Sequence, residues 1–163
     1  MGSIAGLAQQ IDSLRVGRWA ARALKAAPEI EGEDVDGVAF KLSDYRGKKN
    51  VVLCFYPLDW SPVCQGENKC LTDDFPKFQS ANAELFGVSC DSFFSHKAWA
   101  DSLDLKHRLL SDVHRTTAKA YGLYFEPLNC SKRATVIVGK DGKVARKIIG
   151  PQNWDRSDFL EYI

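Results

Sequence analysis

Residues Val51 to Cys64 read VVLCFYPLDWSPVC. The first six of these residues form an unbroken apolar run, which predicts a short strand buried on both faces of a sheet. Pro57 ends that strand, and a helix start follows, because Ser61 is a favourable N-cap and Pro62 suits the first helical position. Cys64 then falls in the first helical turn. There the helix dipole and the unpaired backbone N–H groups favour the thiolate, which is the nucleophilic form of cysteine.

Strands and helices alternate along the rest of the chain. Pro76 should kink or end the helix that begins at residue 62, and Gly122 should close a later helix. Lys140-Asp141-Gly142 predicts a tight turn between two strands. The expected strands cover 38–42, which alternates as an edge strand would, 51–56, 85–89, 134–138 and 143–149, and the further helices cover 95–102, 115–121 and 155–163. This order predicts an α/β fold with a central mixed sheet and helices on both faces.

Residues 1–25 are expected to form an N-terminal helical extension of a main domain that spans residues 26–163. Apolar residues recur there at three- and four-residue steps, as in an amphipathic helix: Ile4, Leu7, Ile11 and Leu14. Such a stripe packs either on its own domain or on a second copy of the chain. The arginines of this segment, with Asp12 as its one acid, also resemble those of an organelle transit peptide.

Composition narrows the class of protein. The chain has 163 residues, of which 45% are hydrophobic and 26% charged, as in a single soluble globular domain. A net charge of +1 gives no attraction to nucleic acid or membranes, and no apolar run approaches the roughly 20 residues of a membrane helix. Five cysteines without a framework spacing predict reduced thiols in a cytoplasm. The three histidines lack a paired ligand spacing and no phosphate-binding glycine loop is present, so we expect no metal and no cofactor.

The segment from Pro57 to Cys64 resembles the active-site motif of the peroxiredoxins, Pro-x-x-x-(Thr/Ser)-x-x-Cys, with Pro57, Ser61 and Cys64 in its fixed positions. The resemblance extends over most of residues 26–150 and implies a thioredoxin-like fold. Its other landmarks are Ala27-Pro28 and residues 42–48, 87–92 and 133–138. Segments 64–67, 96–100 and 110–112 look most like the one-cysteine alkyl hydroperoxide reductase E type, with the bacterioferritin-comigratory type as a near neighbour.

This resemblance implies a thiol-dependent peroxidase that reduces hydrogen peroxide and alkyl hydroperoxides. Cys64 would attack the peroxide and become a sulfenic acid. Arg133 would stabilise both the sulfur and the leaving oxygen. Ser61 would orient the peroxide, and as an N-cap its hydroxyl would accept the backbone N–H of Cys64. Pro57 would shield the pocket, and Glu67 would hold Arg133.

The cysteine that would resolve the sulfenic acid is not fixed by the motif. Lys69 occupies the place five residues after Cys64, and Cys70 comes one residue later. Cys70 is rotated by about 240° from Cys64 on an ideal helix, so a disulfide between them requires unwinding. Cys70, Cys130 and Cys90 are the candidates, but the default expectation is a one-cysteine enzyme. Thioredoxin-like or low-molecular-weight thiols would recycle it, and the resemblance allows a homodimer, because family members often pair as dimers.

The rival hypothesis is a thioredoxin-fold redox sensor or binding protein, switched by oxidation of Cys64 or by a Cys64–Cys70 disulfide. Both hypotheses predict oxidation of Cys64, but only the enzyme predicts fast multiple turnover. A thiol–disulfide oxidoreductase is disfavoured because the chain has no Cys-x-x-Cys.

Overall fold

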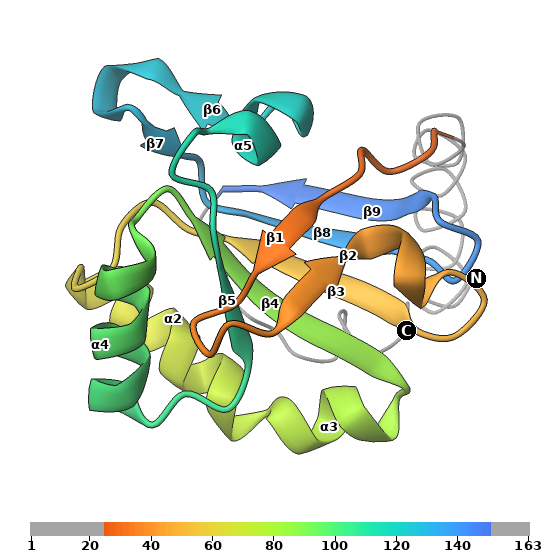
Figure 1. Ribbon diagram of the computed structural model, residues 1–163, viewed down its shortest axis with the longest axis horizontal. Helices are drawn as coiled ribbons and strands as arrows, with labels where there is room; N and C mark the ends of the chain where they lie inside the picture. Colours follow the sequence, from red (N-terminus) through yellow and green to blue (C-terminus); the bar gives the residue numbers. More distant parts are fainter. Residues whose placement is uncertain (1–24, 151–163) are drawn as a thin grey trace, which may run out of the picture.

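A computed structural model describes residues 25–150; the helices expected in residues 1–25 and 155–163 lie outside the described residues. Its centre is a five-stranded sheet with the order β5-β4-β3-β8-β9 (Figure 1). Strands β3, β4 and β5 are parallel, whereas β8 pairs antiparallel with both β3 and β9, so the expected mixed sheet is confirmed. The strands are β3 (Asn50–Phe55), β4 (Ala83–Ser89), β5 (Arg108–Ser111), β8 (Ala134–Val138) and β9 (Val144–Ile149).

Strand β3 lies in the middle of the sheet because its side chains are apolar on both faces. Val51, Leu53 and Phe55 enter the larger core, and Val52 and Cys54 enter a second core on the opposite face. All five of these side chains are buried. The unbroken apolar run therefore forms the doubly buried strand that the sequence predicts.

Three helices cover one face of the sheet: α2 (Pro62–Asp73), α3 (Phe75–Ser80) and α4 (Phe93–Leu103). Figure 1 shows them grouped together on one side of the strands. Helix α2 ends at Asp73 and Pro76 lies in the first turn of α3, so the break expected near this proline is confirmed. Leu71 and Phe78 bury the apolar sides of α2 and α3 against the sheet.

The opposite face is covered mainly by a hairpin of β1 (Glu31–Glu33) and β2 (Ala39–Lys41), with the 3-10 helix η1 (Leu42–Tyr45). Strand β2 was expected as an edge strand, and it pairs only with β1 in a separate two-stranded sheet. Arg108 ties this hairpin to β5, because its Nε donates to Asp34 Oδ2 at 2.6 Å and its Nη2 donates to the carbonyl of Val38 at 3.0 Å.

A short layer follows β5 at the end of the sheet where β3 and β4 stop. It contains α5 (Thr116–Ala120), β6 (Tyr124–Phe125), the 3-10 helix η2 (Glu126–Leu128) and β7 (Cys130–Ser131). Helix α5 is closed by Gly122 at φ 67°, as expected. Within residues 25–150, helices thus lie on both faces, with the short α5 on the hairpin side. Within residues 25–150, no helix combines the length and the apolar character that a bilayer crossing needs.

Candidate active site

The topology brings the reactive loop and the start of β8 to the same edge of the sheet. Strand β3 ends at Phe55, and the loop of residues 56–61 leads from it into α2. Because β8 runs antiparallel to β3, its first residue, Ala134, pairs with Phe55. Arg133, one residue earlier, therefore lies beside the loop although it is 69 residues from Cys64 in the sequence.

Cys64 occupies the first turn of α2, as the sequence predicts, and its side chain is completely buried. Ser61 is the N-cap residue, with φ −69° and ψ 132°, and its carbonyl accepts the N–H of Gln65 at 2.8 Å. Its hydroxyl makes no capping hydrogen bond, so the prediction that it accepts the Cys64 N–H is wrong. Serine lacks the branching methyl that restricts χ1 in threonine, so nothing in the side chain itself enforces the capping rotamer.

Arg133 connects the sulfur to an acid on the same helix. Its Nη2 donates to Sγ of Cys64 at 3.5 Å, and its Nη1 donates to Oε2 of Glu67. Both ion-pair side chains are largely buried, at 16% and 14% exposure, so solvent screens them less than it would a surface pair. A planar guanidinium can hold two partners at fixed angles, and here one is the carboxylate and the other the thiol. The structure thus brings Cys64, Arg133 and Glu67 together.

The reactive loop is anchored by Asp91, which lies between β4 and α4, and by Ser95 of α4. Pro57 is partly buried, and the N–H of Asp59 donates to Asp91 Oδ2 at 2.9 Å. Trp60 adopts a left-handed backbone at φ 62°, which is unusual for a residue with a side chain. Its indole Nε1 donates to the hydroxyl of Ser95 at 3.2 Å. These contacts give the loop one defined conformation around Cys64.

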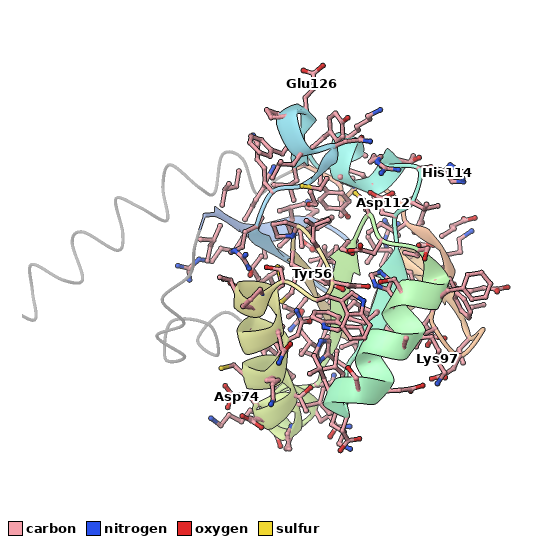
Figure 2. All side chains as sticks on the ribbon, turned by 90° about the vertical axis from the view of Figure 1, so that its left-hand side faces the viewer. Tyr56, Asp74, Lys97, Asp112, His114 and Glu126 are labelled. Atoms are coloured by element: carbon pink, nitrogen blue, oxygen red, sulfur yellow. The ribbon has the colours of Figure 1, made fainter. Side chains whose placement is uncertain are left out.

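A buried histidine–aspartate pair lies beneath this loop, next to Tyr56 (Figure 2). His96 Nδ1 is 2.8 Å from Asp59 Oδ2 and its Nε2 is 3.3 Å from the carbonyl oxygen of Leu110, with both side chains of the pair completely buried. The imidazole ring thus has a carboxylate oxygen at one nitrogen and a carbonyl oxygen at the other. Asp59 also accepts hydrogen bonds from the hydroxyls of Tyr56 and Ser95, at 2.7 and 2.8 Å. Burial and the carboxylate of Asp59 raise the pKa of Tyr56 well above its usual value, so the phenol keeps its proton.

Asp59, Asp91 and His96 have the spacing of a metal site, with ligand atoms within 4.8 Å of one another. Their hydrogen bonds fit a closed polar network better. Nδ1 of His96 already pairs with Asp59 Oδ2, and Asp91 Oδ2 already accepts from the hydroxyl of Ser89 at 2.6 Å as well as from the Asp59 N–H. The cluster is therefore suited to fixing the loop.

Comparison with known proteins identifies the family. Residues 23–147 match the model described as the AhpC/TSA family, which is more than half of the 163 residues. The chain belongs to the AhpC/TSA family. The peroxiredoxin family predicted from the motif is thereby confirmed.

Relatives of this AhpC/TSA chain include both two-cysteine and alkyl hydroperoxide reductase E proteins. The chloroplastic 2-Cys peroxiredoxin BAS1 of Spinacia oleracea is 37% identical over 141 residues, covering 80% of this chain and 53% of the relative. The chain thus matches about half the length of that protein. Alkyl hydroperoxide reductase E of Mycobacterium tuberculosis is 34% identical over 118 residues, covering 71% of this chain and 77% of the relative.

A solved structure confirms the peroxiredoxin fold. Reduced 2-Cys peroxiredoxin of Plasmodium vivax superposes with a TM-score of 0.77 at 32% identity, covering 84% of this chain and 91% of that one. The thioredoxin-like architecture expected from the sequence is therefore confirmed for the central sheet and its helices.

The other thiols of this AhpC/TSA protein lie in less reactive surroundings. Burial raises the pKa of Cys54 to about 12. Burial, together with the carboxylate of Asp112, raises the pKa of Cys90 to about 11. The pKa of Cys130 is also raised by burial, and by the nearby Asp91 and Cys64. Cys70 is partly exposed on α2. All five cysteines are unpaired.

Several residues of the site were not identified from the sequence. Asp59 lies inside the quoted motif, and His96 lies inside a segment that supported the family resemblance, yet neither was assigned a role. Asn68 and His107 are two more buried polar residues close to Cys64. The sequence offers only a weak signal for each of them. Asn68 is a polar residue on the face of α2 that packs inward, and His107 directly precedes β5.

Proposed function

We propose that this chain is a thiol-dependent peroxidase that reduces hydrogen peroxide and alkyl hydroperoxides at Cys64. The observation that carries the proposal is the contact of Arg133 with both Cys64 Sγ and Glu67. A fixed cation beside a first-turn cysteine stabilises the thiolate and also the negative charge that develops on a leaving oxygen. The family membership and the named peroxiredoxin relatives support the same activity.

In the proposed reaction the Cys64 thiolate attacks the terminal oxygen of a hydroperoxide. An S–O bond forms to the terminal oxygen while the O–O bond breaks. The electron pair of the O–O bond leaves with the other oxygen, which carries the alkyl group or hydrogen. This oxygen takes up a proton and departs as an alcohol or as water, and Cys64 is left as a sulfenic acid. Arg133 would donate hydrogen bonds to the reacting oxygens. The hydroxyl of Ser61, which makes no helix-capping hydrogen bond, would orient them. Pro57 would exclude water from the sulfur.

We further propose one-cysteine chemistry, of the alkyl hydroperoxide reductase E or bacterioferritin-comigratory type. A thioredoxin-like or low-molecular-weight thiol would attack the sulfenic sulfur, releasing water and forming a mixed disulfide that a second thiol would reduce. Cys90 and Cys130 are buried thiols with raised pKa values, which disfavours both as resolving residues. Cys70 lies on the same helix as Cys64, so it can reach the sulfur only if α2 unwinds.

The decisive experiment measures hydrogen peroxide consumption with dithiothreitol, or thioredoxin with its reductase, as the electron donor. Cys64→Ser should abolish turnover, whereas Cys70→Ser, Cys90→Ser and Cys130→Ser should each retain it within about twofold. Retained turnover in Cys64→Ser would refute the peroxidase. Loss of turnover in one of the other three variants would assign a resolving cysteine and refute the one-cysteine proposal.

The complete burial of Cys64 favours a second candidate, a redox sensor whose sulfenic acid persists because reductants reach it slowly. Multiple turnover separates the two functions. A sensor would consume about one equivalent of peroxide per chain and then stop, whereas the enzyme would continue as long as thiol is supplied.

We propose a homodimer in a reducing cytoplasm, with residues 1–25 as an extension of the domain that begins at residue 26. Large apolar side chains are exposed around the reactive loop, among them Leu58 and Trp60 and, at the start of α4, Phe94. Such a patch favours contact with another chain. The unpaired state of all five cysteines agrees with a reducing compartment. Sedimentation equilibrium of the reduced chain, with and without residues 1–25, tests the assembly and the role of the extension.

A further inference from the structure

A chain of buried hydrogen bonds attaches Cys64 to the loop before β5. Asn68 lies one turn after Cys64 on α2, and its Nδ2 donates to the carbonyl oxygen of Cys64 at 2.9 Å. Its Oδ1 is 2.9 Å from Nε2 of His107. Nδ1 of His107 is 3.4 Å from the hydroxyl of Thr72, one turn further along the helix. Asn68 and His107 are 1% and 4% exposed, so water does not compete for these groups.

The chemistry of the groups fixes the direction of the two bonds that Asn68 makes. A backbone carbonyl can only accept, so the amide nitrogen of Asn68 must face Cys64 and its oxygen must face His107. Nε2 of His107 therefore carries a proton. Burial lowers the pKa of His107 to about 4, which keeps the ring neutral near pH 7, so Nδ1 has a lone pair that accepts from the Thr72 hydroxyl.

The geometry makes His107 a brace across two turns of α2. Cys64, Asn68 and Thr72 are spaced by four residues and so lie along one face of the helix. His107 lies in the loop just before β5 and contacts two of these three residues, Asn68 and Thr72. The side-chain amide of Asn68 fits here because residue 87 on β4 is a glycine. A Cβ added at Gly87 would lie 3.3 Å from Asn68 Oδ1 and 2.6 Å from Leu109 Cδ2.

We propose that His107, acting through Asn68, is a positioning residue that holds the first turn of α2 and thereby controls how readily the Cys64 sulfur becomes accessible to a reductant. The inference rests on the proposed peroxidase function. Because the sulfur is completely buried, a reductant thiol can attack it only when this turn opens, and opening breaks the bond between Asn68 and the Cys64 carbonyl. Hydrogen peroxide is much smaller than a reductant thiol, so it needs a smaller displacement of this turn to reach the sulfur beside Arg133.

The test is amide hydrogen exchange on the reduced full-length chain, with variants that break or preserve the brace. His107→Leu and Asn68→Ala should each increase exchange in the segment 64–69 about tenfold, the effect of losing about one net hydrogen bond, while β4 stays protected. His107→Gln retains an N–H donor near the position of Nε2 and should restore most of the protection. Tyr121→Phe, which removes a partly buried hydrogen bond to the Pro28 carbonyl on the opposite face, is the matched control and should leave segment 64–69 unchanged.

A kinetic split gives the second readout. In His107→Leu, the oxidation of Cys64 by hydrogen peroxide should stay within about twofold of the wild-type rate, whereas reduction of the trapped sulfenic acid by dithiothreitol should become about tenfold faster. Unchanged exchange in segment 64–69, or an equal increase in β4, would overturn the proposal, because His107 would then be an ordinary core residue. The exchange result does not depend on turnover, so a failure of the peroxidase proposal, seen as no peroxide consumption by the wild type, remains distinguishable.

Discussion

Arg133 and Glu67 form a largely buried ion pair that joins the residue before β8 to α2, directly beside the sulfur of Cys64. The pair fixes the guanidinium from one side, so its second Nη atom points at the thiol. A cation that is held in place before reaction needs no reorganisation when charge develops on the peroxide oxygen. The same contact therefore serves both the thiolate and the leaving group.

Arg133→Ala should slow the oxidation of Cys64 by hydrogen peroxide about a hundredfold or more, the range found when a preorganised donor to developing charge is lost. Stopped-flow fluorescence of the reduced protein measures the second-order rate constant. Lys132→Ala removes an exposed cation next to Arg133 in the sequence and should have little effect. Equal rates in wild type and Arg133→Ala would show that this guanidinium does not take part in the reaction.

Glu67→Gln should have a smaller effect, a loss of about tenfold in the same rate constant. The amide oxygen still accepts a hydrogen bond from Arg133, but the charge that strengthens this bond is gone. Since Glu67 acts through Arg133, the substitution should add almost nothing in the Arg133→Ala background, and a double-mutant cycle measures this coupling. Additive effects of the two substitutions would mean that Glu67 contacts the peroxide independently of the arginine.

Asp59→Asn should lower the free energy of unfolding by about 1–3 kcal/mol, because an amide cannot satisfy all the buried groups that the carboxylate binds, namely His96, Tyr56 and Ser95. The double variant Asp59→Asn/His96→Gln replaces both members of the pair by amides, which can hydrogen-bond to each other, and should recover part of that loss. Urea denaturation at constant pH measures both. A cost below about 1 kcal/mol for Asp59→Asn would show that these hydrogen bonds do not stabilise the folded protein.

The local part of the site could be predicted from the sequence, whereas the long-range part could not. The strand, loop and first helical turn around Cys64 follow one another along the chain, so apolar pattern and helix-start residues were enough to place them. Arg133 is 69 residues away from Cys64, and only the family resemblance pointed to it. The hydroxyl of Ser61 was predicted wrongly because residue preference describes the N-cap position and does not determine the rotamer of an individual serine.

The elements missing from the predicted fold share a physical reason. Strands β1, β6 and β7 have two or three residues each, which is too short for a period-two pattern, and all of β1 is exposed. Strand β5 was not expected because Arg108 interrupts its apolar character, yet this residue is stabilised by Asp34 and stacks over Phe86 at 5.2 Å. The buried pairs Asp59–His96 and Asn68–His107 were missed because pattern analysis assigns polar residues to the surface unless a tertiary partner is known.

His107 should make stability depend on pH between about 6.5 and 4. Burial lowers its pKa from 6.5 to about 4 in the folded protein, so in this window the unfolded chain binds a proton that the folded chain does not. The free energy of unfolding therefore falls as the pH decreases from about 6.5 to 4. The difference between the unfolded and folded pKa values of His107 corresponds to a loss of about 3 kcal/mol in that free energy. His107→Gln has no titrating ring and should lose about 2–3 kcal/mol less than wild type between pH 7 and pH 4. Urea denaturation of both proteins across this pH range measures the difference. Both proteins contain the same Asp and Glu residues, so the contribution of the carboxylates to the pH dependence cancels in that difference. Parallel curves for the two proteins would mean that the imidazole is protonated equally well in the folded and unfolded states, and would contradict the neutral, buried ring that donates to Asn68.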